Sequence, residues 1–214
     1  MSSNLAPILS SLLLGACSVV GIRDGTEEPR HDVVGRAGAA EIRRYAPRIA
    51  AETTVQATEI EARSQGFRRL AAYIFGANTT KASIAMTAPV AQGATSERIA
   101  MTAPVAQDRN AAGAWTIRFF MPARYTLDTL PAPTDPAVTL VPIPAQTYAV
   151  LRFTGSTAPD AVAAQQTELS RTLIGSNWRP DGTPLAWFYD PPWTLPFLRR
   201  NEVAIPVERI PSPS

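Results

Sequence analysis

The chain has 214 residues, and hydrophobic residues make up 45% of them. This length fits one domain with a short export segment and tails. The apolar fraction is enough for a core, which excludes an intrinsically disordered protein. The formal net charge is only +2 and the basic residues are scattered, so the composition gives no footprint for a nucleic-acid partner.

The N-terminal segment holds the single cysteine, Cys17. One cysteine excludes an intrachain disulfide and a cysteine-based zinc site. The run from Leu5 to Val20 is mostly apolar but shorter than a membrane span of about 20 residues, and small residues precede Cys17. This arrangement resembles a lipoprotein signal over residues 1–17, with Cys17 as the lipidated first residue of the mature chain. We therefore expect a membrane anchor in the cell envelope, facing the periplasm on the outer membrane.

An alternative stays open for this segment. The basic residues that usually precede such an apolar run are missing from residues 1–4. An ordinary apolar N-terminus with a buried cysteine would explain the same pattern.

Residues 18–40 are rich in charge, Gly and Pro, which predicts a tether. Short strands are predicted over residues 41–45 and 48–55. Thr58 and Glu61 form a capping-box pattern that predicts the start of a helix, and Gly76 predicts its end. The apolar residues that recur along this helix at near-helical spacing are Ile60, Phe67, Leu70 and Ile74.

The pattern then recurs in the second half of the chain. A second helix is predicted from Thr157 as the capping residue, with Pro159 in the first turn and Gly175 at the end. Val162, Leu169 and Leu173 are expected to line its buried face. Residues 115–121 alternate as a strand with one buried face. Further strands are predicted over residues 138–141, 148–153, 185–189 and 202–207.

The two halves therefore have the same predicted order of elements: a strand, a capped helix and further strands. Two such units predict an α+β fold, in which a curved antiparallel sheet carries a helix on each half. The expected domain covers residues 41–207, and residues 208–214 form a tail.

A literal repeat stands between the two halves. Residues 84–92 reappear unchanged as residues 99–107, which composition alone does not produce. Each copy alternates as an extended segment. Met86 and Met101 are candidates for soft contacts with a flat aromatic ligand, and plain core packing is the alternative.

Several motifs together resemble the SOUL/haem-binding-protein family. They are Met-Thr-Ala-Pro-Val after a helix ending in Gly-x-Asn, Glu-Ile-Arg-Arg-Tyr at 41–45, Tyr-Asp-Pro-Pro at 189–192, and Arg-Arg-Asn-Glu-Val at 199–203. The resemblance spans roughly residues 41–207. It implies a distorted β-barrel flanked by two helices, built from a pseudo-duplicated unit. It also implies binding of haem or a related tetrapyrrole in an apolar groove.

The resemblance suggests which residues bind the ligand. It implies Phe67, Leu70 and Ala71 on the first helix, with Tyr189 and Trp193 on the loop. Arg63 or Arg199 would pair with the propionates. The alternatives are core packing for Phe67 and Leu70, and an ion pair of Arg199 and Arg200 with Glu202.

A departure from the family pattern bears on the iron. Some members carry a histidine, proposed as an axial ligand, where this chain has Arg44, and a guanidinium has no lone pair to offer. The only histidine, His31, falls in the expected tether. We therefore predict exchangeable haem binding without a histidine ligand and no resident metal site. With no histidine expected in the domain, we also predict no catalytic constellation.

Three other functions stay open. The chain could bind other amphipathic small molecules. It could be an enzyme that acts on tetrapyrroles through Tyr189 or Glu202. It could also be an envelope structural protein with a filled pocket. Uptake of a dye panel, product formation and the absence of any uptake would distinguish them.

Overall fold

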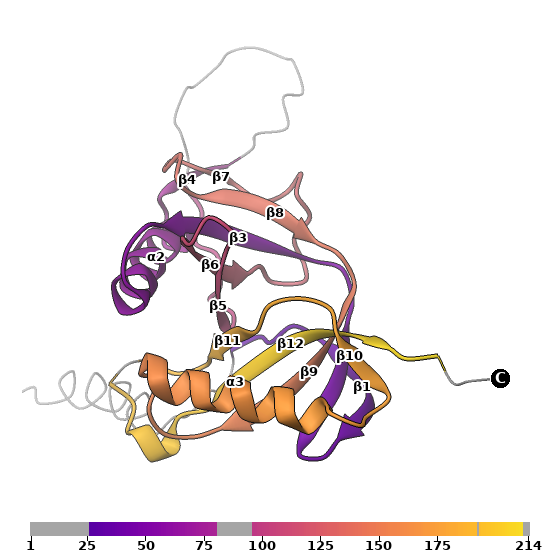
Figure 1. Ribbon diagram of the computed structural model, residues 1–214. Coiled ribbons are helices and arrows are strands. Elements are labelled where there is room, and N and C mark those ends of the chain that lie inside the picture. The colour runs from indigo at the N-terminus through magenta and orange to yellow at the C-terminus, as the bar shows by residue number, and fades with distance from the viewer. Residues whose placement is uncertain (1–25, 81–95, 192, 212–214) are drawn as a thin grey trace, which may run out of the picture.

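The computed structural model describes residues 26–80, 96–191 and 193–211. Within them, a ten-stranded antiparallel sheet and a separate pair of short strands accompany two α-helices and one 3-10 helix (Figure 1). In chain order the elements are β1 (His31–Ala37), β2 (Ala40–Tyr45), β3 (Arg48–Val55), α2 (Glu59–Ile74), β4 (Asn78–Thr79), β5 (Val105–Arg109), β6 (Trp115–Phe120), β7 (Ala132–Pro133), β8 (Thr139–Ile143), β9 (Gln146–Phe153), α3 (Pro159–Leu173), β10 (Trp178–Pro180), β11 (Leu185–Phe188), η1 (Pro196–Leu198) and β12 (Asn201–Arg209).

The sheet confirms the predicted duplication, and it shows in addition that the two halves exchange strands. The strand order is β1-β2-β9-β12-β11-β5-β6-β3-β8. In one half β3 leads through α2 to the hairpin β5–β6, and in the other β9 leads through α3 to β11 and β12. Strand β2, which precedes β3, pairs with β9, whereas β8, which precedes β9, pairs with β3. Each half therefore completes its sheet with a strand from the other, which makes one interlocked domain.

The predicted helices form where local signals place them. Thr58 and Glu61 form the predicted capping box, in which Glu61 Oε2 accepts from the Thr58 backbone N–H at 3.3 Å. The Thr58 hydroxyl also donates to Glu61 Oε2, at 2.8 Å. Gly76, just past the helix end, has φ +124°, a conformation that favours glycine. At Gly66 a Cβ would lie 2.7 Å from Ile117 Cγ1, so the absence of a side chain lets α2 approach β6 closely.

The second helix corrects one detail of the prediction. Its capping residue is Ala158 rather than Thr157. The buried residues of α3 are Val162, Leu169 and Leu173, as predicted.

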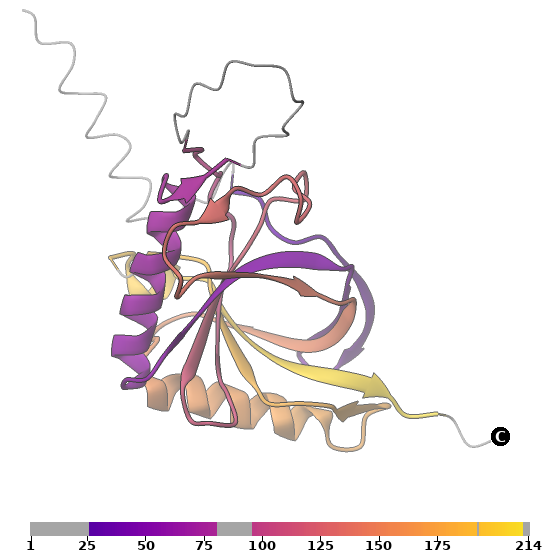
Figure 2. The same cartoon turned by 90° about the horizontal axis from the view of Figure 1, so that it is seen from above.

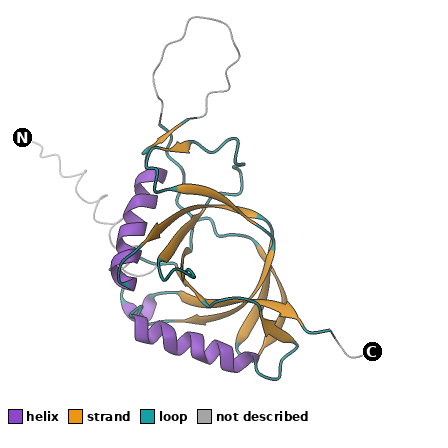
Figure 3. Ribbon diagram, turned by 45° about the horizontal axis from the view of Figure 1, so that its top comes forward, coloured by secondary structure: helices purple, strands orange, loops and turns teal. Residues whose placement is uncertain are grey.

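Both helices cover the same, outer face of the curved sheet (Figures 2 and 3). One core cluster joins α3 to β9 and β12, and a second joins α2 to β3 and β6. A third cluster lies on the concave face and includes Tyr45, Phe120, Tyr148 and Trp187. Strand residues therefore alternate between a helix-covered face and a concave face that is also buried.

Three expectations differ from the structure. The sheet is curved but open, with β1 and β8 at its edges, so the barrel form of the prediction does not occur. The expected tether over residues 18–40 contains β1, which places His31 inside the domain. Strand β6 is buried on both faces rather than one, because Ile117 and Phe119 meet α2 while Thr116 and Phe120 are buried on the concave side.

Some predicted features lie outside the described residues. These are residues 1–17 with Cys17, the first copy of the repeat with Met86, and the end of the tail. Among the described residues, no helix is both long and apolar enough to cross a membrane.

Candidate functional site

Four of the residues suggested as ligand contacts lie on α2 and on the loop around η1: Arg63, Phe67, Trp193 and Arg199. We call them the helix–loop surface. The two terminal nitrogens of Arg63 donate to the carbonyl oxygen of Thr157, each at 3.2 Å. The Arg63 guanidinium also lies 4.6 Å from the centre of the Phe188 ring. These contacts hold the Arg63 side chain, which extends from α2, against the segment that leads into α3.

Arg199 brings a second positive charge to the same place. Burial lowers the pKa of Arg63, the charge of Glu59 opposes that effect, and the nearby charge of Arg199 lowers the pKa further. Arg199 Nε donates to the carbonyl oxygen of Thr194 at 2.8 Å, which ties its side chain to the loop before η1. Two half-buried guanidinium groups whose charges lie near each other form a natural position for an anion.

Exposed aromatic side chains accompany these arginines. Phe67 lies one turn after Arg63 on α2, is 38% exposed, and makes an edge contact with Phe119 at 5.4 Å between ring centres. Trp193 is 62% exposed. The loop residues Leu195 and Phe197, which the sequence did not single out, are exposed as well. The backbone N–H of Gly155 donates to the carbonyl oxygen of Pro196, which ties the loop around η1 to the approach to α3, where Arg63 is also bonded.

The other suggested residues lie elsewhere. Leu70 is fully buried in the core beneath α2, and Ala71 packs half-buried against the same cluster. Met101 is 41% exposed just before β5, and nothing described links it to the helix–loop surface. Tyr189 points to the concave face, since it follows Phe188, which faces the helices. The structure therefore places Tyr189 away from the helix–loop surface, although Tyr189 lies only four positions before Trp193 in the sequence.

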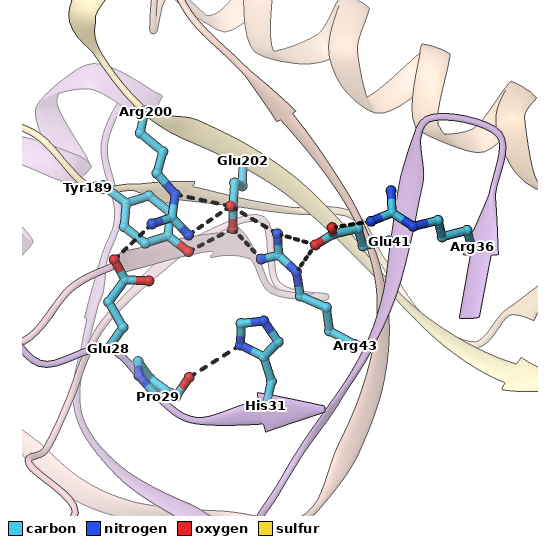
Figure 4. Close-up of polar contacts among 9 residues, drawn as sticks. All are labelled: Glu28, Pro29, His31, Arg36, Glu41, Arg43, Tyr189, Arg200 and Glu202. Atoms are coloured by element: carbon cyan, nitrogen blue, oxygen red, sulfur yellow. Dashed lines mark hydrogen bonds and ion pairs between the residues drawn. The ribbon is translucent and has the colours of Figure 1, made fainter. Parts of the chain in front are cut away.

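A buried network of charges lies on the concave face (Figure 4). At its centre is Glu202, which is 0% exposed. Arg43 Nη1 donates to Glu202 Oε2 at 2.9 Å, and Arg200 Nη2 donates to Oε1 at 3.0 Å. The Tyr189 hydroxyl donates to Oε2 at 2.6 Å. We call this group, with Glu28 on Arg200 and Glu41 on Arg43, the Glu202 network.

The network stabilises the charged form of Glu202. Burial alone would raise the pKa of Glu202, but the charges of Arg43 and Arg200 and the hydrogen bonds from Arg43 and Tyr189 outweigh it and lower the pKa. Burial and the charge of Glu202 raise the pKa of Tyr189 well above its ordinary value. Tyr189 is therefore a neutral hydrogen-bond donor at physiological pH, not a poised base.

Only part of this network was predictable from the sequence. The ion pair of Arg200 with Glu202, held open as an alternative, forms, while Arg199 bonds elsewhere. Sequence reasoning missed Arg43, which stands between Ile42 and Arg44 and so gives no local signal for a buried pair. Its partner lies 159 positions away, and periodicity carries no information about such a distance.

The pocket that the described residues form on the concave face is too small for a porphyrin. It lies between Arg48, Phe120 and Trp187, with a cavity volume of about 10 Å³, room for about one water molecule. The helix–loop surface, by contrast, offers exposed rings for a flat apolar face and two guanidinium groups for acidic substituents. Its residues fit a tetrapyrrole. In the described part of the chain no cluster of three or more His, Cys, Asp or Glu residues could hold a metal ion.

The SOUL heme-binding protein family matches residues 26–206. The chain belongs to this family. The match begins before β1, which agrees with the strand that replaces part of the expected tether. No curated protein matches the chain significantly.

Solved structures support the fold alone. The EcmrR C-terminal domain has a TM-score of 0.56 at 11% identity, over 80% of this chain and 98% of that one. An EcmrR–DNA complex gives 0.55 at 13% identity, over 80% and 57%. A hydrolase from Listeria innocua gives 0.51 at 13% identity, over 78% and 91%. SOUL domains thus share this architecture with proteins of different kinds, which leaves the function to be argued from the site.

Proposed function

We propose that this SOUL domain binds haem or a related tetrapyrrole at the helix–loop surface, as a carrier, buffer or sensor. Arg63 and Arg199 would pair with the propionates, and Phe67 and Trp193 would lie against the macrocycle. The observation that carries the proposal is the pairing of two half-buried guanidinium groups next to exposed aromatic side chains.

The charges of Arg63 and Arg199 favour an anionic ligand. Two cations held close together repel each other, and an anionic ligand removes that cost when it bonds to both. Exposed aromatic rings gain by covering a flat apolar surface, at roughly 25 cal/mol per Å² of apolar area. A dicarboxylate attached to a flat ring system satisfies both requirements at once.

The ligand would be held without imidazole. The chain has one histidine, His31, whose ring packs 5.0 Å from Tyr45 on the other side of the sheet from the helices. Binding through apolar contact and propionates alone favours an exchangeable ligand. A tetrapyrrole without iron should therefore bind about as well as haem.

A titration of the purified chain with haem, followed by the Soret band, tests the proposal. Saturation near one equivalent is expected. Replacing Arg63 or Arg199 with glutamine should weaken binding about tenfold each, as loss of about 1.4 kcal/mol implies. Arg171→Gln is the matched control, because Arg171 is exposed on α3 and pairs only with Glu168. A non-saturating response, or equal affinity in all four proteins, would refute the site.

A parallel titration with iron-free protoporphyrin and with apolar dyes separates tetrapyrroles from other amphipathic molecules. Dyes that lack acidic groups should bind no more weakly to Arg63→Gln than to the unchanged chain. If such dyes bind more tightly than either porphyrin, the second candidate, a receptor for amphipathic molecules in general, becomes the better account. The exposed Phe197 and Leu195 favour that candidate.

The location of the protein is a further proposal. Lipidation at Cys17 would anchor the chain to the envelope, with the outer membrane as the expected site. Expression with labelled palmitate, beside a Cys17→Ser variant, tests it: label in the first and not in the second is expected. We also keep the predictions that the protein is not an enzyme and has no nucleic-acid partner.

A further inference from the structure

A second arginine of the concave face, Arg48, has a different environment from Arg43. Its guanidinium lies 4.7 Å from the ring centres of both Tyr45 and Phe120, and 5.9 Å from that of Tyr148. The Nε and Nη1 atoms are buried and have no hydrogen-bond partner among the described residues. Aromatic faces attract the cation, but they offer no acceptor to the N–H groups of Nε and Nη1.

The same pocket holds another unsatisfied donor. Trp187 is 2% exposed, and its indole Nε1 also lacks a hydrogen-bond partner in the described part of the chain. Arg48 and Trp187 both line the cavity of about 10 Å³, together with residues of the segment that leads into β1. Three buried donors at one small cavity call for an acceptor, since each buried unmade hydrogen bond is costly.

The carboxylates of this face are already committed to other arginines. Arg118 Nε bonds Glu52 at 2.6 Å and its Nη1 bonds Asp108 at 2.7 Å. Glu28, the acidic residue on the pocket wall, pairs with Arg200 at 2.8 Å. Arg48 itself makes no ion pair with a described residue. A water molecule could accept a hydrogen bond from these donors, but it would leave a buried positive charge without a counter-charge.

We propose that this pocket is an anion site, in which Arg48 and Trp187 hold one monovalent anion of about halide size. The cavity has room for about one water molecule, which limits the ion to one not much larger than that, and the donors set the sign of its charge. The site lies on the opposite face of the sheet from the helix–loop surface, and it does not depend on tetrapyrrole binding.

Thermal unfolding of the purified full chain tests the site. Bromide replaces gluconate at constant ionic strength, so general screening stays fixed. A saturable rise in Tm is expected, about 3–6 °C at ten times the dissociation constant. Arg48→Met should remove this rise. Arg44→Met is the control, because Arg44 is exposed on β2, the strand that precedes β3 in the sequence, and its replacement should leave the rise unchanged.

A second variant and a direct observation cover the case in which Arg48→Met fails to fold. Trp187→Phe keeps the ring and removes one donor, so the bromide concentration at half-saturation should rise about tenfold. Crystals grown with bromide should give an anomalous peak within hydrogen-bond distance of Arg48 and Trp187. No saturable effect of bromide and no peak would mean that the pocket holds only water, which overturns the proposal.

Larger anions test the size of the ion that the pocket accepts. Formate and acetate carry the same charge as bromide but are larger, so they should raise Tm less at equal concentration. A larger rise with acetate would overturn the assignment to a halide-sized ion. A rise with bromide that persists in Arg48→Met would place the anion elsewhere and overturn the site itself.

Discussion

Arg43 and Arg48 lie five positions apart and on the same concave face, yet the fold treats their charges in opposite ways. Arg43 bonds the fully buried Glu202 and also Glu41, within a network in which each acid has a basic partner. Arg48 is held between aromatic rings, with two of its nitrogen atoms unbonded. One end of this face is therefore electrically complete, and the other lacks a partner.

This difference determines how much stability the protein loses when a residue is replaced in the Glu202 network or beside Arg48. In a complete network, removing one member leaves a buried charge without its counter-charge, which is expensive. At the incomplete end, removing the arginine takes away a cost that is already present. The comparison therefore predicts large losses around Glu202 and small ones around Arg48.

The largest effect is expected from Glu202→Ala. Arg43 and Arg200 lose their common partner, and the Tyr189 hydroxyl loses its acceptor. We expect the free energy of unfolding to fall by about 3–5 kcal/mol, measured by urea denaturation. Glu208→Ala is the control: its pair with Arg179 is exposed, so a loss of about 0–1 kcal/mol is expected. Equal losses in the two variants would show that the network contributes nothing special.

A smaller effect is expected from Tyr189→Phe. The change removes a hydrogen bond of 2.6 Å to an ionised carboxylate, which is worth about 1.5–3 kcal/mol. Tyr125→Phe is a matched control, since the Tyr125 hydroxyl also donates to a carboxylate, that of Glu97, at 2.6 Å but nearer the surface. Urea denaturation should give a clearly smaller loss for the control. The reverse order would contradict the importance of burial here.

Acid should act on the same network more gently. The pKa of Glu202 is lowered in the folded protein, with burial opposing the shift, from an ordinary value of 4.5. The stability that this shift supplies is present above about pH 4.5 and is lost as the pH falls through the folded-state pKa. Urea midpoints between pH 5 and pH 2.5 should therefore fall less steeply in Glu202→Gln than in the unchanged chain. Parallel curves would mean that other acids govern acid unfolding.

Sequence reasoning succeeded where the signal is local. The capping box at Thr58, the apolar face of α3 and the bounds of β3 all depend on residues within a few positions of each other. These elements imply the duplicated α+β fold. The family motifs suggested Arg63 and Arg199 as ligand contacts, and the structure brings their charges near each other, while their role in binding stays a prediction.

It failed where the determining contact is distant. The edge strand β1 has an irregular polar pattern and is defined by pairing with β2, so it resembled a tether. The family resemblance implies Tyr189 and Trp193 together on one loop, but alternation along β11 sends Tyr189 to the concave face. The ion pair of Arg43 with Glu202 and the aromatic cage of Arg48 depend on strands from both halves, which no local pattern specifies.

The smallest effect is expected where the network reaches solvent, at Glu28. Its pair with Arg200 fixes the segment before β1, and side chains of that segment line the Arg48 pocket. Because Glu28 is partly exposed, Glu28→Gln should cost only about 0.5–1 kcal/mol overall.

The local effect of Glu28→Gln should be clearer than the global one. The amide of Ala103, which donates to the Glu27 carbonyl oxygen at 3.0 Å, should exchange with solvent several-fold faster. The amide of Ile205 in the central strand β12 should not change. Asp32→Asn, which removes the exposed pair with Arg44, is the control and should leave Ala103 protected. Unchanged exchange at Ala103 would mean that backbone contacts alone hold the segment before β1. The Arg48 pocket would then keep its wall without help from the Glu202 network.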